Sequence, residues 1–152
     1  MLKRFVLLLP LAAFAADPSG FHVWKSAELK NYEKKLSQKV DEKKLSGQSL
    51  GQYGNHTTSM SHREGNGEAE VHEHVNDFFH IQSGEATLIL GGKVASPKTT
   101  APGEIRGPSI DGGTKHTVSA GDMVHIDAGV PHQFMVEAGK QITYFVVKVN
   151  SK

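Results

Sequence analysis

The sequence predicts an all-β fold, an antiparallel sandwich or barrel, with one amphipathic helix before it. From residue 51 onward, short runs rich in β-branched and aromatic residues are separated by glycine, proline and asparagine, which is typical of strands joined by turns. No second helical pattern follows, and strands without intervening helices favour antiparallel pairing. A chain of 152 residues with 38% hydrophobic content is long enough for one core and short for two.

The composition excludes several classes of function. The 17 lysines and arginines nearly balance the 16 aspartates and glutamates, which leaves a net charge of +1. No dense basic stripe is present, so nucleic acid is not an expected partner. Cysteine is absent, whereas histidine occurs 9 times. A disulfide framework and a thiolate site are therefore excluded, and any metal must be bound by nitrogen and oxygen.

The first residues have the pattern of a secretory signal peptide. Two basic residues precede an apolar run over residues 5–14. This run is shorter than the roughly 20 residues that a membrane-spanning helix needs, so we expect cleavage near Ala15 or Ala16. The mature protein is then expected to begin near Asp17, to be secreted or periplasmic, and to have no membrane partner.

Residues 25–45 have the pattern of one amphipathic helix. Its apolar residues recur at spacings of three and four among lysines and glutamates: Leu29, Tyr32, Leu36 and Val40. This spacing places them on one helix face, which we expect to dock on the barrel. Ser26 is the expected N-terminal cap, and Gly47 lies just beyond the expected end.

The chain is thus expected to divide into three segments: a signal peptide over 1–16, a helical segment over 17–48 and a β-barrel domain over 49–152. Within the barrel domain, residues 92–115 are rich in proline, glycine and threonine and have no clear period. We expect them to form a long loop between two strands, with or without a short hairpin.

Several histidines lie within one strand-like stretch, residues 71–85. His72 and His74 are two residues apart, so in a regular strand their side chains point to the same face and can bind one metal ion. In such a strand His80 shares that face and Asp77 does not, whereas a bulge before Asp77 reverses this assignment. The sequence leaves both arrangements open.

Two segments resemble the motifs of the cupin family of small β-barrels. Residues 67–84 (GEAEVHEHVNDFFHIQSG) are similar to the first motif, and residues 121–133 (GDMVHIDAGVPHQ) are similar to the second. The acid in the first motif is an aspartate where glutamate is usual. The resemblance implies a jelly-roll-like cupin barrel that holds one divalent metal ion. The implied ligands are His72, His74, Asp77 and His132, with His80 as the alternative to Asp77.

Imidazole and carboxylate ligands suit Zn²⁺, Fe²⁺, Ni²⁺, Mn²⁺ or Cu²⁺ and leave coordination positions open. An open position lets the metal polarise a substrate oxygen or activate a water. The resemblance therefore implies a metalloenzyme of the dioxygenase, isomerase or lyase type that acts on a small polar or phenolic molecule. The alternative is a module that binds a small ligand or the metal without turnover, and a purely structural metal is a third interpretation. Cupins commonly pair through edge strands, so the resemblance also suggests a homodimer.

The remaining polar residues receive lesser roles. His125 alternates with two apolar residues and is expected to face outward. His56 and His62 are expected to line the barrel mouth or its rim. Arg106, within the predicted loop, is interpreted as a solvated side chain. Phe79, Ile81, Phe134 and Val136 are expected to fill the barrel interior.

Overall fold

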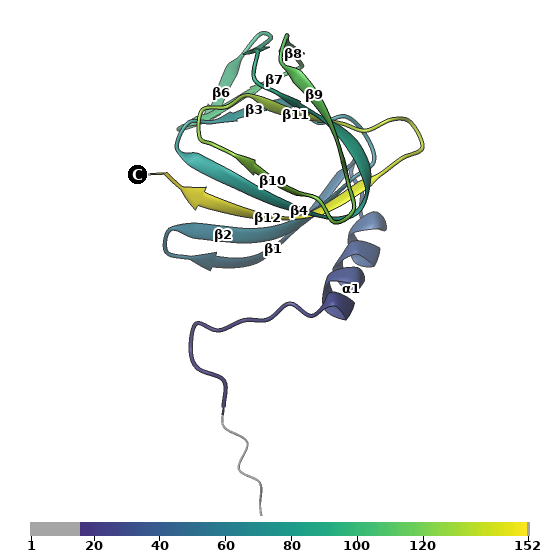
Figure 1. Cartoon of the computed structure of the whole chain (residues 1–152), viewed down its shortest axis with the longest axis vertical. Helices are drawn as coiled ribbons and strands as arrows, with labels where there is room; N and C mark the ends of the chain where they lie inside the picture. Colours follow the sequence, from purple (N-terminus) through teal and green to yellow (C-terminus); the bar gives the residue numbers. More distant parts are fainter. Residues whose placement is uncertain (1–15, 152) are drawn as a thin grey trace, which may run out of the picture.

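The structure, a computed structural model, describes residues 16–151 of the chain. In this part, one helix precedes twelve strands; ten of them form one sheet that curls into a barrel, and the other two pair as a separate small sheet (Figure 1). The signal peptide expected over 1–16 lies, except for its last residue, outside the described residues. The elements are α1 Ser26–Ser37, β1 Leu45–Tyr53, β2 His56–Arg63, β3 Ala69–His72, β4 Val75–Leu90, β5 Lys93–Val94, β6 Lys98–Ala101, β7 Glu104–Gly107, β8 Ile110–Asp111, β9 Thr114–Ser119, β10 Met123–Ile126, β11 His132–Met135 and β12 Ile142–Asn150.

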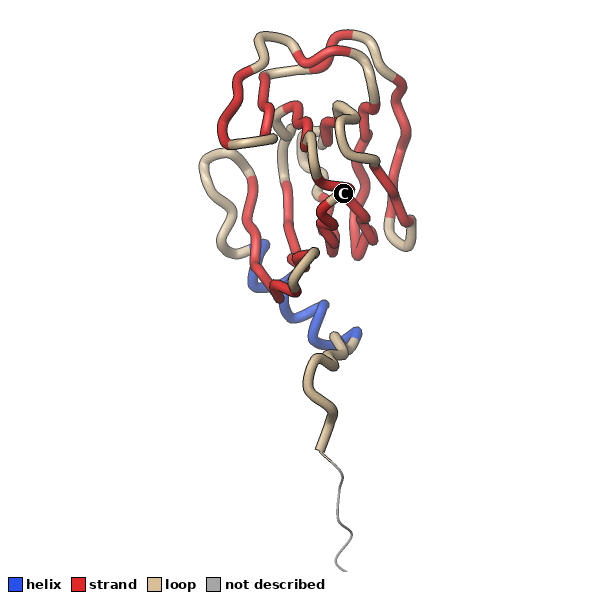
Figure 2. The backbone as a smooth tube through the Cα atoms, turned by 90° about the vertical axis from the view of Figure 1, so that its left-hand side faces the viewer, coloured by secondary structure: helices blue, strands red, loops and turns tan. Residues whose placement is uncertain are grey.

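The strands form two antiparallel layers. The first layer contains β1, β2, β12, the first half of β4 and β10. The second contains β6, β7, β3, β11, the second half of β4 and β9. The strands surround a common interior, with α1 at one end (Figure 2). This arrangement confirms the all-β barrel with one N-terminal helix that the sequence predicts.

Strand β4 belongs to both layers. Its residues up to Gly84 pair with β12 and β10, and its residues from Glu85 pair with β11 and β9. At the boundary, Gly84 has a φ of +77°, and a Cβ atom there would collide with the backbone carbonyl of Gln141. Glycine meets both conditions because it has no Cβ. The bend lets the two halves of β4 close the two layers around one interior.

Apolar side chains fill this interior. Phe79, Phe134 and Tyr144 form an aromatic cluster with ring centroids 5.0 to 5.4 Å apart. Ile81 and Val136 are buried in the same core. The prediction that these phenylalanines, Ile81 and Val136 fill the barrel is therefore confirmed.

The helix is shorter than the sequence predicts. It ends at Ser37, and the chain then turns into β1, so that Gly47 lies within a strand and not beyond a helix end. The hydroxyl of Ser46 donates a hydrogen bond of 2.7 Å to the carbonyl of Leu36 in the last turn. Residues 38–44, which were expected to continue the helix, instead form a turn in which the backbone N–H of Lys44 donates to the carbonyl of Asp41 and that of Leu45 donates to the Asp41 carboxylate. The turn leads into the pairing of β1 with β2, and this tertiary pairing outweighs the local helical pattern. Leu36 is buried as expected, and the barrel begins at Leu45.

Among the described residues, no helix is long and apolar enough to cross a membrane.

Residues 92–115 contain four short strands, more order than the predicted loop. Strands β6 and β7 form a hairpin, the alternative that the sequence left open, and β7 also pairs with β3. In this pairing Arg106 lies opposite Glu70, and Glu104 lies opposite His72. The segment therefore extends the second layer and brings two charged residues beside Glu70 and His72 of β3.

Candidate metal site

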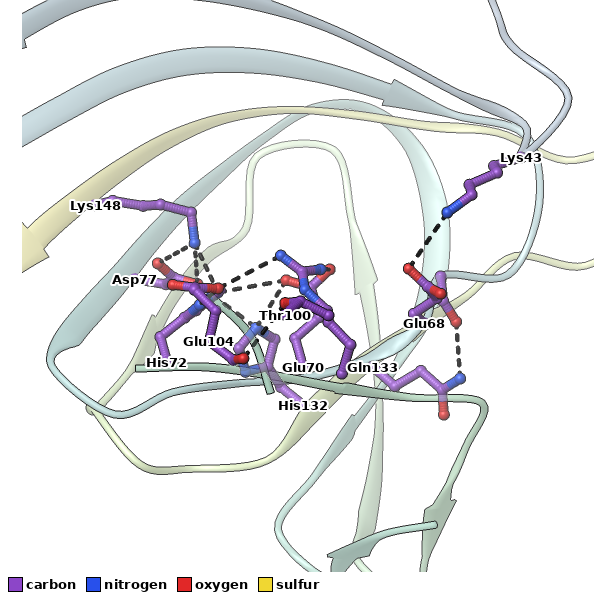
Figure 3. Close-up of polar contacts among 12 residues, drawn as sticks. Lys43, Glu68, Glu70, His72, Asp77, Thr100, Glu104, His132, Gln133 and Lys148 are labelled. Carbon is purple, nitrogen blue, oxygen red and sulfur yellow. Dashed lines mark hydrogen bonds and ion pairs between the residues drawn. The ribbon is translucent and has the colours of Figure 1, made fainter. Parts of the chain in front are cut away.

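Charged and histidine side chains from both layers converge inside the barrel (Figure 3). The second layer contributes residues from β3, β7 and β11, and the first layer contributes residues from β4 and β12. We call this group the polar cluster. Its members are Glu70, His72, Asp77, Glu104, Arg106, His132 and Lys148.

Four potential ligand atoms face one another in the polar cluster. Nε2 of His72 lies 3.3 Å from Oε2 of Glu70 and 3.4 Å from Oδ2 of Asp77. Nε2 of His132 lies 3.5 Å from the same Asp77 oxygen and 3.9 Å from Oε2 of Glu70. Ligand atoms about 2.0 to 2.2 Å from one metal ion are separated by roughly 3.0 to 3.6 Å. The spacing therefore suits coordination by two imidazoles and one or two carboxylates.

The outer nitrogen of each imidazole is hydrogen-bonded to an acceptor. Nδ1 of His72 lies 2.7 Å from Oε2 of Glu104, and Nδ1 of His132 lies 3.1 Å from the carbonyl oxygen of Val130. When each Nδ1 carries the proton and donates it outward, each Nε2 presents a lone pair to the centre. Metal-binding histidines are oriented in this way by carboxylates and carbonyls.

Two cations also belong to the polar cluster. The ammonium of Lys148 donates to both oxygens of Asp77, at 2.9 and 3.1 Å, and lies 2.8 Å from Nε2 of His72. The guanidinium of Arg106 forms an ion pair with Glu70 and lies 3.6 Å from Glu104. These contacts neutralise carboxylates that burial would otherwise destabilise. A metal ion bound by His72 and Asp77 must displace the Lys148 ammonium.

The environment lowers the pKa of Glu70 to about 2. Burial by itself raises the pKa of this carboxyl, but the hydrogen bond with His72 and the charge of Arg106 outweigh burial. The Glu70 side chain is 20% exposed. It is therefore an ionised carboxylate at neutral pH, the form that binds a metal.

The two imidazoles have opposite pKa shifts. Burial acts to lower the pKa of His72, but the hydrogen bond with Glu70 and the charges of Asp77 and Glu104 raise it above its ordinary value, against the opposing charge of Lys148. Burial lowers the pKa of His132. His132 is therefore neutral at neutral pH, whereas His72 competes more strongly for a proton in the metal-free protein.

The donor set fits a divalent metal ion. Ligand atoms of Glu70, His72 and His132 all lie within 4.8 Å of one another, and Asp77 adds a carboxylate to both imidazoles. Nitrogen and oxygen ligands of this kind bind borderline divalent cations. The outward hydrogen bonds of both Nδ1 atoms support the same interpretation.

Five members of the polar cluster line one part of a cavity of about 190 Å³: Glu70, Asp77, Arg106, His132 and Lys148. Another part of the wall is apolar and contains the aromatic cluster of Phe79, Phe134 and Tyr144. A small molecule in this cavity lies beside Glu70, Asp77 and His132. Charge and apolar surface therefore meet in one binding space, which is typical of small-ligand sites.

His74, a ligand expected from the sequence, lies apart from the polar cluster. Strand β3 ends at His72, and His74 follows in an exposed turn with its ring near Gly103. The turn is held by a backbone hydrogen bond from Glu73 to the carbonyl of Gly103. The expected regular strand through both histidines is not present, so their side chains do not share a face. Glu70, two residues before His72 on β3, points to the centre instead.

The same turn decides which residue of β4 faces the cluster. The strand restarts at Val75, and its alternation turns Asp77 inward, where it is 1% exposed. His80 alternates with the buried Phe79 and Ile81 and lies on the outer side of the strand. Of the two alternatives that the sequence left open, the structure brings Asp77 to the imidazoles.

Four members of the polar cluster were absent from the expected ligand set. Glu70 could have been predicted, because it precedes His72 by two residues and alternate residues of a strand share one face. Glu104 and Arg106 lie in the segment interpreted as a loop, and Arg106 is not the solvated side chain expected there. Lys148 is distant in the sequence and reaches the site through the pairing of β12 with β4.

The other histidines lie outside the polar cluster. His125 is 48% exposed and stacks on Phe78, with ring centroids 4.4 Å apart, which confirms that it faces outward. His62 is buried and bonded to Thr143 at 2.8 Å, so it has a local partner inside the first layer and does not lie on the rim.

Comparison with known proteins identifies the fold. No protein-family model matches the sequence, and no curated protein matches it significantly. The structure is similar to the Cnp3 cupin domain of Schizosaccharomyces pombe, at 10% identity and a TM-score of 0.53 over 76% of this chain and 63% of that one. It is similar to a double-stranded β-helix protein from Klebsiella pneumoniae, at 17% identity and a TM-score of 0.54 over 74% and 82%. The polyketide cyclase RemF of Streptomyces resistomycificus matches at 16% identity and a TM-score of 0.51 over 70% and 66%.

The lowered pKa of Glu70 predicts acid-dependent stability of the metal-free protein. Ionised Glu70 stabilises the fold fully above its unfolded pKa of about 4.5. This contribution, about 3 kcal/mol, is lost as the pH falls from about 4.5 toward 2. In urea unfolding with chelator present, the free-energy difference between wild type and Glu70→Gln should therefore shrink between pH 7 and pH 3. Glu85→Gln, at an exposed ion pair, is the control, and a Glu70 difference that does not change with pH would contradict the prediction.

Proposed function

We propose that this chain, which has a cupin-type β-barrel fold, binds one divalent metal ion and acts as a metalloenzyme on a small polar or phenolic molecule. The proposed ligands are His72, His132 and Glu70, with Asp77 as a further carboxylate. His74, which the sequence suggested, is not included because its side chain lies outside the cluster.

The orientation of the two imidazoles carries the proposal. Both Nδ1 atoms contact acceptors on the outside, while both Nε2 atoms face the carboxylates of Glu70 and Asp77. Histidines that only stabilise the barrel need hydrogen-bond partners, but they do not need two carboxylates that face both Nε2 atoms. A site prepared for a cation explains the arrangement.

When bound, the metal supplies a Lewis acid or activates oxygen or water. The residues of the chain define what surrounds it. Glu104 holds the ring of His72, and Arg106 balances the charge of Glu70. The aromatic wall of the cavity limits the water that reaches a bound molecule. Lys148, once displaced by the metal, still has its ammonium within reach of the cavity as a proton donor or a counter-charge.

A second candidate function is a module that binds a small ligand or the metal without turnover. The contact of the Lys148 ammonium with His72 and Asp77 favours the form that binds a small ligand, because these atoms already have a cationic partner. In addition, both cavity-lining carboxylates of the cluster are paired with cations, and neither is free as a general base.

Metal binding tests the proposal. We expect the purified wild type to bind one Zn²⁺ or Ni²⁺ in isothermal titration calorimetry. Glu70→Gln and His132→Ala should each weaken binding by at least about tenfold, since each removes a ligand. His74→Ala is the matched control, and its affinity should equal that of the wild type. Loss of binding in His74→Ala with retention in Glu70→Gln would contradict the proposed ligand set.

Lys148→Met gives a second measure of the same site. Removing the ammonium should strengthen metal binding by about tenfold, because the metal no longer displaces a cation. Lys115→Met, at an exposed position of β9, is the control. A wild type that stays metal-free while Lys148→Met binds metal would show that the ammonium is the resident cation, and would overturn the proposal.

Turnover separates the enzyme from the binding module. We expect the metal-loaded protein to convert at least one compound in a screen of small polar and phenolic molecules. His132→Ala should lower that rate by at least about a hundredfold, and His125→Ala, on the outer surface, should leave it unchanged. Compounds that bind in the cavity with no turnover would favour the module.

We also propose that the chain is exported. Residues 1–16 support this through their basic start, their short apolar run and the small residues that follow. Mass spectrometry of the protein secreted or released from the periplasm should give a chain that begins near Asp17. An uncleaved chain inside the cell would contradict export. The homodimer suggested by the cupin resemblance stays a prediction.

A further inference from the structure

Arg63 is a buried cation that has no carboxylate partner among residues 16–151. It is the last residue of β2 and is 6% exposed. Its Nε atom is buried and has no hydrogen-bond partner in the described part of the chain. A charge removed from water is unfavourable unless a counter-charge or a full set of hydrogen bonds compensates it. The guanidinium lines the same cavity as the polar cluster.

The carboxylates of the cavity are already paired with other cations. Asp77 contacts Lys148, and Glu70 contacts Arg106. The third, Glu68, lies 3.8 Å from the exposed Lys43. No described ion pair of these three carboxylates includes Arg63. Arg63 is therefore the cavity-lining cation that these ion pairs leave out, and the carboxylate of a bound molecule finds a counter-charge there.

The surroundings of Arg63 position the guanidinium. A Cβ atom on Gly67 would lie only 3.0 Å from Nη1 of Arg63, so the guanidinium packs against bare backbone. That backbone is fixed in turn, because Gly67 donates to the carbonyl of Phe134 at 2.8 Å and accepts from Nε2 of Gln133 at 2.8 Å. The guanidinium thus rests on a rigid support, as precise recognition requires.

Neutral donors and apolar rings complete the cavity. Ser59 and Ser61 contribute hydroxyl groups to its wall. Burial raises the pKa of Tyr144, against the opposing charge of Arg63, so the phenol stays protonated and can donate. The ring of Tyr144 stacks on Phe134 at 5.0 Å. Hydrogen-bond donors beside one cation suit an acidic group, and a flat apolar wall suits an apolar body. The cavity therefore fits a ligand that has both parts.

We propose that the cavity binds a small carboxylic acid with an apolar body, whose carboxylate pairs with Arg63 and whose body packs against Phe134 and Tyr144. A planar carboxylate matches the planar guanidinium in shape and charge. An inorganic anion has no apolar part to use the aromatic wall. The statement that this acid is the substrate of the metal site rests on the proposed function. The statement that the cavity binds the acid does not.

The test is calorimetric titration of benzoate into the purified protein, once loaded with Zn²⁺ and once stripped of metal and desalted. Benzamide is the uncharged ligand of nearly the same shape, and inorganic phosphate is the comparison anion. Arg63→Met removes the guanidinium and keeps an apolar chain, and Arg63→Lys keeps the charge without the planar group. Lys115→Met, which removes an exposed positive charge on β9, is the matched control.

We expect benzoate to bind both preparations, and benzamide and phosphate to bind at least about tenfold more weakly. Arg63→Met should weaken benzoate binding by at least about tenfold, Arg63→Lys should lie between it and the wild type, and Lys115→Met should equal the wild type. If Arg63→Met does not fold, Arg63→Lys and the benzamide comparison decide the same question.

Several results would overturn the inference. Equal benzoate affinity in wild type and Arg63→Met would exclude Arg63 as the partner, and loss of binding on removal of the metal would assign the carboxylate to the metal. Equal affinity for benzamide would exclude charge recognition, and equal affinity for phosphate would indicate a general anion site. No binding of benzoate up to about 10 mM would also overturn it. Benzoate binding to the metal-stripped protein is measured without any metal. Failure of the metal proposal can therefore be distinguished from failure of this inference.

Discussion

The bend of β4 at Gly84 is the constraint on which the rest of the molecule depends. Strand β4 has a central position in both layers. Its two halves face each other because the backbone turns at Gly84, where a Cβ atom would collide with the carbonyl of Gln141. The aromatic cluster then holds the layers apart at a distance set by packed rings. Asp77 from one layer reaches the imidazoles of the other because this spacing is fixed.

Pairing of buried charges organises the interior that this closure creates. In a medium of low polarity an isolated carboxylate or ammonium is unfavourable, so each charge of the polar cluster has an opposite neighbour. The hydrogen bonds from both Nδ1 atoms leave the Nε2 atoms free to face inward. Arg63 is the exception, a buried guanidinium whose Nε has no partner in the described chain. Under the two proposals, one cavity therefore binds a cation at the polar cluster and an anion at Arg63.

His72 and Asp77 share one cationic partner at the centre of the polar cluster. In the structure this partner is the ammonium of Lys148, on a flexible side chain that is 37% exposed, and under the proposed function a divalent metal takes its place. The same atoms of His72 and Asp77 serve both, so occupancy by one excludes the other. This competition links the lysine of the last strand to the proposed metal site, because its ammonium contacts His72 and Asp77 in the structure.

The sequence by itself determined the fold class and the helix that precedes the barrel, and it predicted His72, Asp77 and His132 as members of one site, because alternation, turn residues and the two motifs are local signals. It did not determine which neighbours join them. Whether His74 or Glu70 faces inward depends on where β3 ends, and that end is set by a hydrogen bond to the β6–β7 hairpin. Helix α1 was predicted too long because the turn over residues 38–44, which leads into the pairing of β1 with β2, is not visible in local periodicity. Lys148, Arg106 and Arg63 reach the cavity through strand pairings between distant segments, and only tertiary structure decides such contacts.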